Sequence, residues 1–312
     1  MHVPTECAEV PNMTTESTST LPTLADVPYG VHERQALDWW RAKTPGPNPL
    51  LFHIHGGGWV QGDKRVVRDL DRYLAAGISV VSINYRFTTQ AQIAHVHPPV
   101  LWPLQDCARA LQFVRSKAEE WGIDRHRIAA SGESAGACSS LWLALHDDLA
   151  DPLNNDPIAR ESTRLYCAAV NQTQVTLDPV AMKQWIPNSR YGGHAFGFMP
   201  DPRDLGTRDL GFSNFLAARD SLLPLIREFS PLEHVRAGAP PIYMIFNNPP
   251  APGQPQSDPT HSADFGVKLQ ERLRSVGADC ELVYPGATRV RHPTLTDYLI
   301  ARLRAGSLAA AV

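Results

Sequence analysis

The sequence predicts an α/β fold in which a mostly parallel central sheet carries helices on both faces. From about residue 49 onward, short apolar runs typical of buried strands alternate with longer segments whose apolar residues recur at helical spacing. The first run, at 49–55, stops at three consecutive glycines, as a buried strand ending in a sharp loop does. A length of 312 residues leaves room for one large α/β domain or two small ones.

The expected elements follow one another in a regular order. Strands are expected at 49–55, 78–85, 127–131, 165–170, 241–246 and 280–284. Helices are expected at 100–121, 135–145, 261–276 and 294–304. The first of these helices has apolar residues at helical spacing, namely Leu104, Cys107, Ala108, Leu111 and Val114. Strands separated by helices cross back in the same direction, which favours a parallel sheet.

The segment from about 171 to 229 breaks this rhythm. It is irregular, rich in glycine and proline, and contains several aromatic residues, including Trp185 and Phe198. A structureless loop of that length is unusual inside a compact domain. We therefore expect a cap of short helices over the active site, with Trp185 and Phe198 in contact with substrate. The alternative is a second packing layer without a substrate role.

The N-terminal residues and the cysteines bear on the domain organisation and the cellular location of the protein. Residues 1–25 are polar and are expected to form a loose N-terminal arm, with one domain over 26–312. The arm lacks the apolar core of a signal peptide, so a cytoplasmic location is expected, with a removed leader as the alternative. The five cysteines are widely spaced and indicate buried thiols rather than a disulfide framework: Cys7, Cys107, Cys138, Cys167 and Cys280.

Composition excludes two kinds of partner. A net charge of −3 provides no basic field for nucleic acid. No apolar stretch is long enough to span a bilayer, so no membrane span is expected. The oligomeric state is left open.

A serine nucleophile is indicated by residues 132–136, Gly-Glu-Ser-Ala-Gly. This pattern is typical of a tight strand-to-helix turn that exposes the Ser134 hydroxyl above a sheet. The small residues of the following helix suit close packing, and the helix N-terminus directs a partial positive charge at the nucleophile. Glu133 is expected either to support the site and contact substrate or to be a solvated residue of the turn.

A second motif lies upstream, at the end of the 49–55 strand. His-Gly-Gly-Gly-Trp at 55–59 is typical of a loop that supplies backbone N–H groups to an oxyanion hole. We expect these donors to be Gly57 and Gly58, together with Ala135 after the nucleophile. His55 and Trp59 are expected to brace this loop, and Trp59 is also expected to contact substrate. The two motifs together predict a serine hydrolase that acts through an acyl-enzyme.

Ser134 needs a histidine base and a carboxylate that orients it. In hydrolases with such a turn the acid precedes the histidine in the chain. His292 is the one histidine beyond the last predicted strand, so it is the expected base. Asp258 is the expected acid because Asp264 falls inside a predicted helix. His261 lies between them and is the alternative base or a substrate contact.

A metal site is not expected from the histidine pairs. His53 and His55, like His95 and His97, have spacing that a metal can use on a strand, but no third ligand accompanies either pair.

The run from His55 to Lys64, His-Gly-Gly-Gly-Trp-x-x-Gly-Asp-Lys, resembles esterases of the α/β-hydrolase superfamily. The nearest branches are the hormone-sensitive-lipase-like carboxylesterases and the bacterial feruloyl-esterase-like or acetyl-xylan-esterase-like enzymes. Residues 29–30 and 35–38 resemble the first strands of the second branch. The resemblance implies an α/β-hydrolase fold from about residue 27 onward. It also implies a Ser-His-Asp hydrolase of small or carbohydrate-linked carboxylic esters without a cofactor.

The chain departs from this pattern in one place. The family usually has its histidine soon after a Tyr-Pro-Gly turn, whereas Arg289 holds that position here and His292 follows three residues later. Two other functions stay open. One is an amidase resembling the formylkynurenine-hydrolysing enzymes, and the other is a non-catalytic binding protein, which the displaced histidine favours. Acyl and alcohol specificity are not determined by the sequence.

Overall fold

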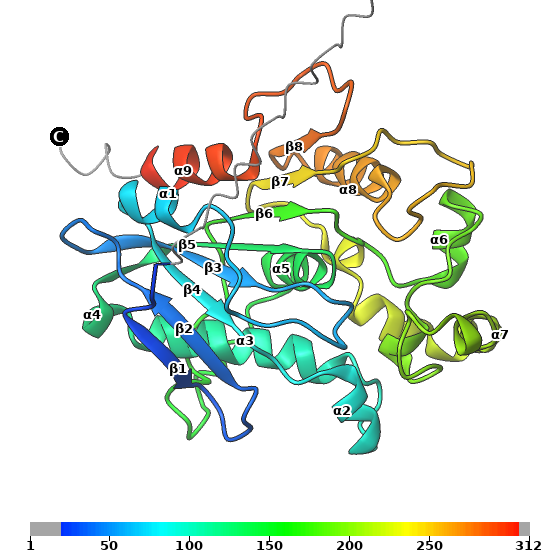
Figure 1. Cartoon of the computed structure of the whole chain (residues 1–312), viewed down its shortest axis with the longest axis horizontal. Coiled ribbons are helices and arrows are strands. Elements are labelled where there is room, and N and C mark those ends of the chain that lie inside the picture. Colours follow the sequence, from blue (N-terminus) through cyan, green and yellow to red (C-terminus); the bar gives the residue numbers. More distant parts are fainter. Residues whose placement is uncertain (1–19, 306–312) are drawn as a thin grey trace, which may run out of the picture.

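An eight-stranded sheet forms the centre of the molecule, in the order β1-β2-β4-β3-β5-β6-β7-β8 (Figure 1). The computed structural model describes residues 20–305. The strands are β1 (Leu24–Pro28), β2 (Ala36–Trp40), β3 (Asn48–Ile54), β4 (Ser79–Ile83), β5 (Ile123–Glu133), β6 (Cys167–Asn171), β7 (Ile242–Ile245) and β8 (Cys280–Val283). β2 runs antiparallel to β1 and β4, and the neighbouring pairs from β4 to β8 are parallel. The predicted mostly parallel sheet is therefore confirmed.

Helices alternate with the strands along the chain, and several lie beyond the carboxyl edge of the sheet (Figure 1). They are α1 (Leu70–Ala75), α2 (Thr88–Ile93), α3 (Leu101–Ser116), α4 (Ala118–Trp121), α5 (Ala135–Leu145), α6 (Pro179–Trp185), α7 (Leu205–Glu228), α8 (Ala263–Ser275) and α9 (Leu295–Ala305), with short 3-10 turns η1 (Gly193–Phe196) and η2 (Pro231–His234). The sequence did not predict α1 and α2. They are only six residues each, too short to show a helical repeat.

Both faces of the sheet are covered, which explains why the central strands are apolar throughout. In β3, Leu50, Phe52 and Ile54 point into a core shared with α3, α5 and α8. Leu51 points to the opposite face, where it packs in a smaller cluster with α1 and α9. The predicted pair of helical layers is confirmed by these two clusters.

The predicted helix over 100–121 is interrupted in the structure. α3 ends at Ser116, and α4 begins at Ala118, with Lys117 in a non-helical conformation between them. The helix predicted to begin at residue 261 begins at Ala263 instead. Ser262 caps it, because the Ser262 hydroxyl accepts a hydrogen bond from the Asp264 N–H at 3.1 Å.

The N-terminal arm predicted for residues 1–25 lies mostly outside the described residues, as does Cys7. Its last residues differ from the prediction, since β1 begins at Leu24 and pairs with β2. The indole N–H of Trp40 also donates to the Thr20 carbonyl at 2.8 Å. Within residues 20–305, no helix combines the length and the apolar character needed to cross a membrane.

The 171–229 segment forms α6, η1 and α7, which lie beyond the carboxyl ends of the central strands (Figure 1). The expectation of short helices is wrong for α7, which runs for 24 residues. Asp204 caps its start by accepting from the Gly206 N–H at 2.9 Å. Phe212 and Phe215, three residues apart, anchor one face of α7 in the core. Its internal Gly and Pro residues concealed this pattern in the sequence.

Candidate active site

Ser134 stands at the turn between β5 and α5 in a strained backbone conformation. Its φ of 53° and ψ of −119° are rarely adopted by a residue with a side chain. A Cβ at Gly136 would overlap the carbonyl oxygen of Ile54, and one at Gly132 would come within 2.5 Å of Gly136. The turn can form only because both flanking residues are glycine. The predicted strand-to-helix turn is confirmed.

The glycine loop after β3 lies against this turn. A Cβ at Gly56 would come within 2.7 Å of the Glu133 carbonyl oxygen. Gly57 and Gly58 have φ values of 99° and 62°, in the left-handed region. Within residues 20–305 the N–H groups of Gly57 and Gly58 donate to no other residue. The Ala135 N–H, at the first position of α5, has no intrahelical acceptor. These three donors are free to bind an oxyanion.

His261 is the histidine that contacts Ser134. Its Nε2 lies 2.9 Å from Ser134 Oγ, and its Nδ1 lies 2.8 Å from Asp258 Oδ2. The imidazole therefore bridges a hydroxyl and a carboxylate, as a general base and its orienting acid require. The position predicted for Asp258 in the site agrees with this geometry, although its partner is His261.

The prediction of His292 as the base is contradicted. His292 Nδ1 lies 2.8 Å from Glu281 Oε2, and the His292 backbone N–H donates to Glu281 Oε1 at 2.7 Å. Strand pairing connects Ser131 of β5 with Glu281 of β8 through Ala169 and Tyr243. Glu281 therefore lies three strands away from β5, at roughly 14 Å for the usual strand spacing. His292 also packs edge-on against Tyr298 of α9, on the face of the sheet opposite α5.

The segment after β8 turns back along that strand, which explains the displacement. Arg291 contacts both Asp279 and Glu281 at the start of β8. Burial raises the pKa of the Glu281 carboxyl, but hydrogen bonds from the side chain and backbone of His292 and from the Arg291 N–H outweigh it, so the pKa is lowered overall. The Glu281 side chain is only 2% exposed, so the charge needs these partners. His292 is a hydrogen-bond partner of a buried carboxylate and lies away from the nucleophile.

The loop that carries Asp258 and His261 is held by the cap and by α8. Asn188 exchanges two hydrogen bonds with the Gln256 backbone, at 2.8 and 3.0 Å. The Gln256 side chain donates to Asp264 at 2.7 Å. Asp264, rejected as the acid because of its place in a helix, thus holds the loop. The spacing Asp-x-x-His at 258–261 was a usable signal in the sequence, because residues three apart in a tight turn can meet, and the His261 N–H donates to the Asp258 carbonyl at 3.3 Å.

A cavity of about 620 Å³ opens beside the nucleophile. Its wall combines polar side chains, among them Glu133, Asn171, Asn247 and Thr294, with apolar ones such as Val67 and Leu295. Glu133 also forms an exposed ion pair with Arg68 at 3.7 Å, which contributes little to stability. Glu133 therefore lies at the cavity wall next to the nucleophile.

Trp59 does not face this cavity. Its side chain is 0% exposed, and its indole N–H donates to the Ser139 hydroxyl of α5 at 3.0 Å. A substrate contact by Trp59 is contradicted by this burial, whereas its bracing role for the glycine loop agrees with it. Trp185 packs edge-on against Phe265, and Phe198 packs against Phe215. Neither Trp185 nor Phe198 lines the cavity.

Two histidines near the glycine loop are held neutral. Burial lowers the pKa of His53 and of His55 to about 4. The His55 ring stacks on Tyr85 at a centroid distance of 4.3 Å, and the Tyr85 hydroxyl donates to the His55 carbonyl at 2.9 Å. Neutral His55 therefore helps fix the start of the glycine loop, in agreement with the bracing role expected for it.

Sequence comparison connects this geometry with known proteins. The sequence profile of the BD-FAE family matches residues 38–249. LipM of Mycobacterium tuberculosis, a probable carboxylic ester hydrolase, is 35% identical over 151 residues, which cover 46% of this chain and 32% of that protein. The chain matches about a third of the length of such curated relatives.

Two solved structures share the fold. A truncated carbohydrate esterase from gut microbiota superposes with a TM-score of 0.64 at 17% identity, over 92% of this chain and 98% of that one. Esterase 2 of Thermogutta terrifontis, phosphonylated by sarin, superposes with a TM-score of 0.62 at 20% identity, over 91% and 93%. The predicted resemblance to α/β-hydrolase esterases is confirmed, and because the profile covers more than half of the 312 residues, the chain belongs to the BD-FAE family.

Proposed function

We propose that this protein hydrolyses carboxylic esters through an acyl-enzyme on Ser134. One observation carries the proposal: the continuous hydrogen-bonded series from Ser134 Oγ through His261 to Asp258. This arrangement supplies a nucleophile, a base and an acid within contact distance, in front of a loop with free N–H donors. Family membership supports the same reaction class.

The reaction proceeds in two halves. His261 Nε2 removes the Ser134 proton as Oγ attacks the ester carbonyl, and the oxyanion accepts hydrogen bonds from Gly57, Gly58 and Ala135. The imidazolium then protonates the departing alcohol as the carbonyl–oxygen bond breaks. Water, deprotonated by His261, attacks the acyl-enzyme and releases the carboxylic acid, returning the proton to Ser134. The chemistry uses only these groups and water.

Asp258 determines which ring nitrogen of His261 carries the proton. With the Nδ1 proton directed at Asp258 Oδ2, the Nε2 lone pair faces Ser134. The carboxylate also stabilises the imidazolium that forms during attack. The Asp258 side chain is 44% exposed, so this effect is weaker than in a fully buried pair.

The polar side chains at the cavity wall can bind a hydroxylated alcohol portion of the ester. Glu133, Asn247 and Thr294 offer donors and acceptors at the cavity wall. A carbohydrate carrying a small acyl group would match this lining. The likeness to a carbohydrate esterase from gut microbiota supports this substrate class.

Turnover of nitrophenyl acetate and of acetylated sugars tests the proposal. The native protein should hydrolyse both, and a fluorophosphonate should label Ser134 alone. Ser134→Ala should lose the label and the activity. An inactive native protein that fails to label would exclude the reaction, and labelling at another serine would exclude this nucleophile.

A further inference from the structure

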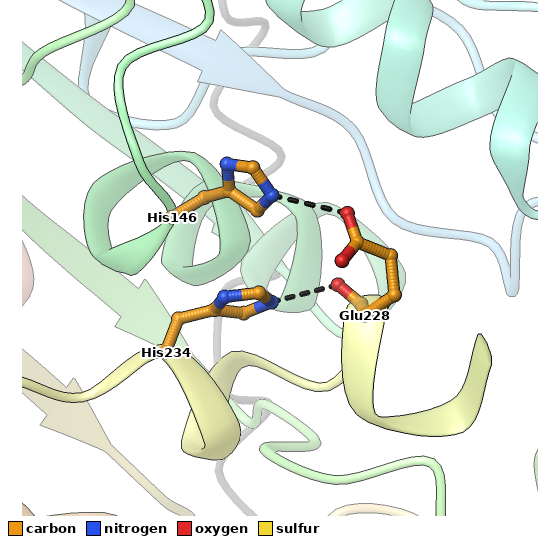
Figure 2. A group of neighbouring side chains, drawn as sticks. All are labelled: His146, Glu228 and His234. Carbon is orange, nitrogen blue, oxygen red and sulfur yellow. Dashed lines mark hydrogen bonds and ion pairs between the residues drawn. The ribbon is translucent and has the colours of Figure 1, made fainter. Parts of the chain in front are cut away.

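Three potential metal ligands gather at the end of α5 remote from Ser134. His146 follows the last residue of α5, Glu228 ends α7, and His234 ends η2 (Figure 2). Their nearest ligand atoms all lie within 4.8 Å of one another. With a rise of 1.5 Å per residue, α5 separates this group from the nucleophile by about 16 Å. The group is therefore independent of the proposed ester chemistry.

The contact between His146 and Glu228 indicates a cation. His146 Nδ1 lies 2.9 Å from the Asp147 carbonyl oxygen, which can only accept, so Nδ1 carries a proton. In the neutral ring, Nε2 then presents a lone pair. That atom lies 3.1 Å from Glu228 Oε1, a carboxylate acceptor. Two acceptor atoms at this distance repel each other unless a proton or a metal ion lies between them.

A backbone carbonyl that orients Nδ1 is also the usual outer partner of a metal-binding histidine. It fixes the tautomer and aims Nε2 at the ion. Here Asp147 fills that role for His146. The His146 side chain is 12% exposed, so its ring is held in place rather than free in solvent.

His234 can turn to bind the same ion without leaving its present hydrogen-bond acceptor, the Glu228 carbonyl, unpaired. Its Nε2 lies 2.7 Å from the Glu228 carbonyl oxygen, and its ring centre lies 4.6 Å from that of His146 (Figure 2). The Trp142 indole N–H donates to the same carbonyl at 2.9 Å. If the His234 ring turns toward an ion, the carbonyl keeps a donor.

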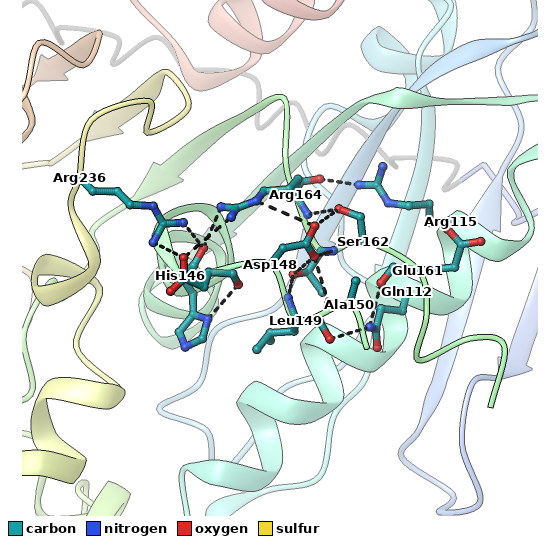
Figure 3. A network of polar contacts seen from close by, with 12 residues as sticks. Gln112, Arg115, His146, Asp148, Leu149, Ala150, Glu161, Ser162, Arg164 and Arg236 are labelled. Atoms are coloured by element: carbon teal, nitrogen blue, oxygen red, sulfur yellow. Dashed lines mark hydrogen bonds and ion pairs between the residues drawn. The ribbon is translucent and has the colours of Figure 1, made fainter. Parts of the chain in front are cut away.

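The backbone beneath His146 is anchored by a polar network (Figure 3). Arg164 and Arg236 each donate to the His146 carbonyl at 3.2 Å. Asp147 pairs with Arg236 at 2.7 Å, so this positive charge is balanced nearby. Asp148 accepts from the Thr163 N–H at 2.8 Å, which holds the following segment. A ligand on so fixed a backbone requires little ordering when an ion binds.

We propose that His146, Glu228 and His234 form a binding site for Zn²⁺. Two imidazoles and one carboxylate are a ligand set that zinc accepts in proteins, with water in the fourth position. Zinc–ligand bonds are about 2.0–2.2 Å long, so ligand atoms now within 4.8 Å need only side-chain rotations to converge. The ion joins the end of α5 to the segment that leaves the cap, and so stabilises the attachment of α7 to the core.

Metal titration of the untagged, EDTA-treated full chain tests the site. Zn²⁺ measured by calorimetry should bind with one ion per chain and raise Tm. Co²⁺ should give the visible absorption of a tetrahedral N/O complex. His146→Gln and His234→Gln should each weaken Zn²⁺ binding at least tenfold. His126→Gln changes an exposed histidine on β5 and should bind zinc like the native chain.

A measurement on the native chain covers the case in which a variant does not fold. The ring resonances of His146 and His234 should shift together during zinc titration in an NMR experiment. Binding that is unchanged in both ligand variants, or shifts confined to other histidines, would overturn the proposal. The absence of any one-to-one binding would also overturn it.

Discussion

His261 and Asp258 stand three residues apart in one loop, and His261 Nδ1 lies 2.8 Å from Asp258 Oδ2. The same imidazole reaches Ser134 from the turn just before α8, on the sheet face that α5 also covers. A single segment thus positions both proposed partners of the nucleophile. The segment after β8 was expected to supply the base. In the structure, His292 of that segment contacts Glu281 instead.

The two histidines should behave oppositely when removed. His261→Ala should lower kcat by roughly 10⁴-fold or more, because the base and its proton transfers are lost together. His292→Ala should keep kcat within about twofold and instead lower Tm, because Glu281 loses a partner in a buried site. Steady-state kinetics and thermal unfolding of both variants check this. A large loss of kcat in a folded His292→Ala would return that residue to the catalytic machinery.

The glycine loop should tolerate no side chain at Gly57. A Cβ there would overlap the Gln61 carbonyl, and the φ of 99° already disfavours other residues. Gly57→Ala should displace an oxyanion donor and lower kcat by roughly 10²–10³-fold. Gly238→Ala is the matched control, because Gly238 also has a positive φ of 80° but no atom within 4 Å of its Cβ position. Equal kcat values in the two variants would argue against an oxyanion role for this loop.

The contact between the cap and the Asp258 loop should affect turnover. Asn188→Ala removes both hydrogen bonds to the Gln256 backbone, so the loop that orients His261 loses an anchor. We expect kcat to fall by about 10- to 100-fold with a smaller change in KM, since misplacing a catalytic group slows the chemical step. Asn154→Ala, in an exposed loop away from the site, serves as the control. A native kcat for Asn188→Ala would show that the loop is positioned without the cap.

The free energy of unfolding should decrease in acid, because buried histidines are neutral in the folded protein. Burial lowers the pKa of both His55 and His194 to about 4, whereas an unfolded histidine titrates near 6.5. Between about pH 6.5 and pH 4 the unfolded chain binds protons that the folded chain does not, so the free energy of unfolding decreases as pH falls. Each such histidine contributes about 3 kcal/mol to this decrease when it is complete.

Urea unfolding at pH 7.5 and pH 4.5 measures this effect. His194→Leu removes one of the buried titrating groups and should make the pH dependence shallower than in the native protein. His126→Gln, at an exposed position, should leave the dependence unchanged. An identical decrease in the native protein and His194→Leu would assign the acid sensitivity to other groups.

Much of the fold was predictable because it rests on local patterns. The strand at 49–55 is an apolar run that ends at glycines, and the structure forms β3 over Asn48–Ile54. The turn around Ser134 was equally predictable, because the Gly-x-Ser-x-Gly pattern is itself local, although Gly132 and Gly136 are also required by contacts with Ile54 of β3. By contrast, α7 was hidden, since a helix with internal Gly and Pro depends on tertiary packing of Phe212 and Phe215 rather than on propensity.

The sequence by itself determined the order of the parallel strands and of the helices α3, α5, α8 and α9, the serine turn and the glycine loop, because their patterns depend on residues close together in the chain. Which histidine meets Ser134 was decided only by the tertiary structure. His261 and His292 both follow strands in the last third of the chain, and the Asp-x-x-His spacing at 258–261 is the local feature that distinguishes them. The difference arises because the segment after β8 turns back and contacts Glu281, while the turn before α8 brings His261 to the face on which α5 presents Ser134.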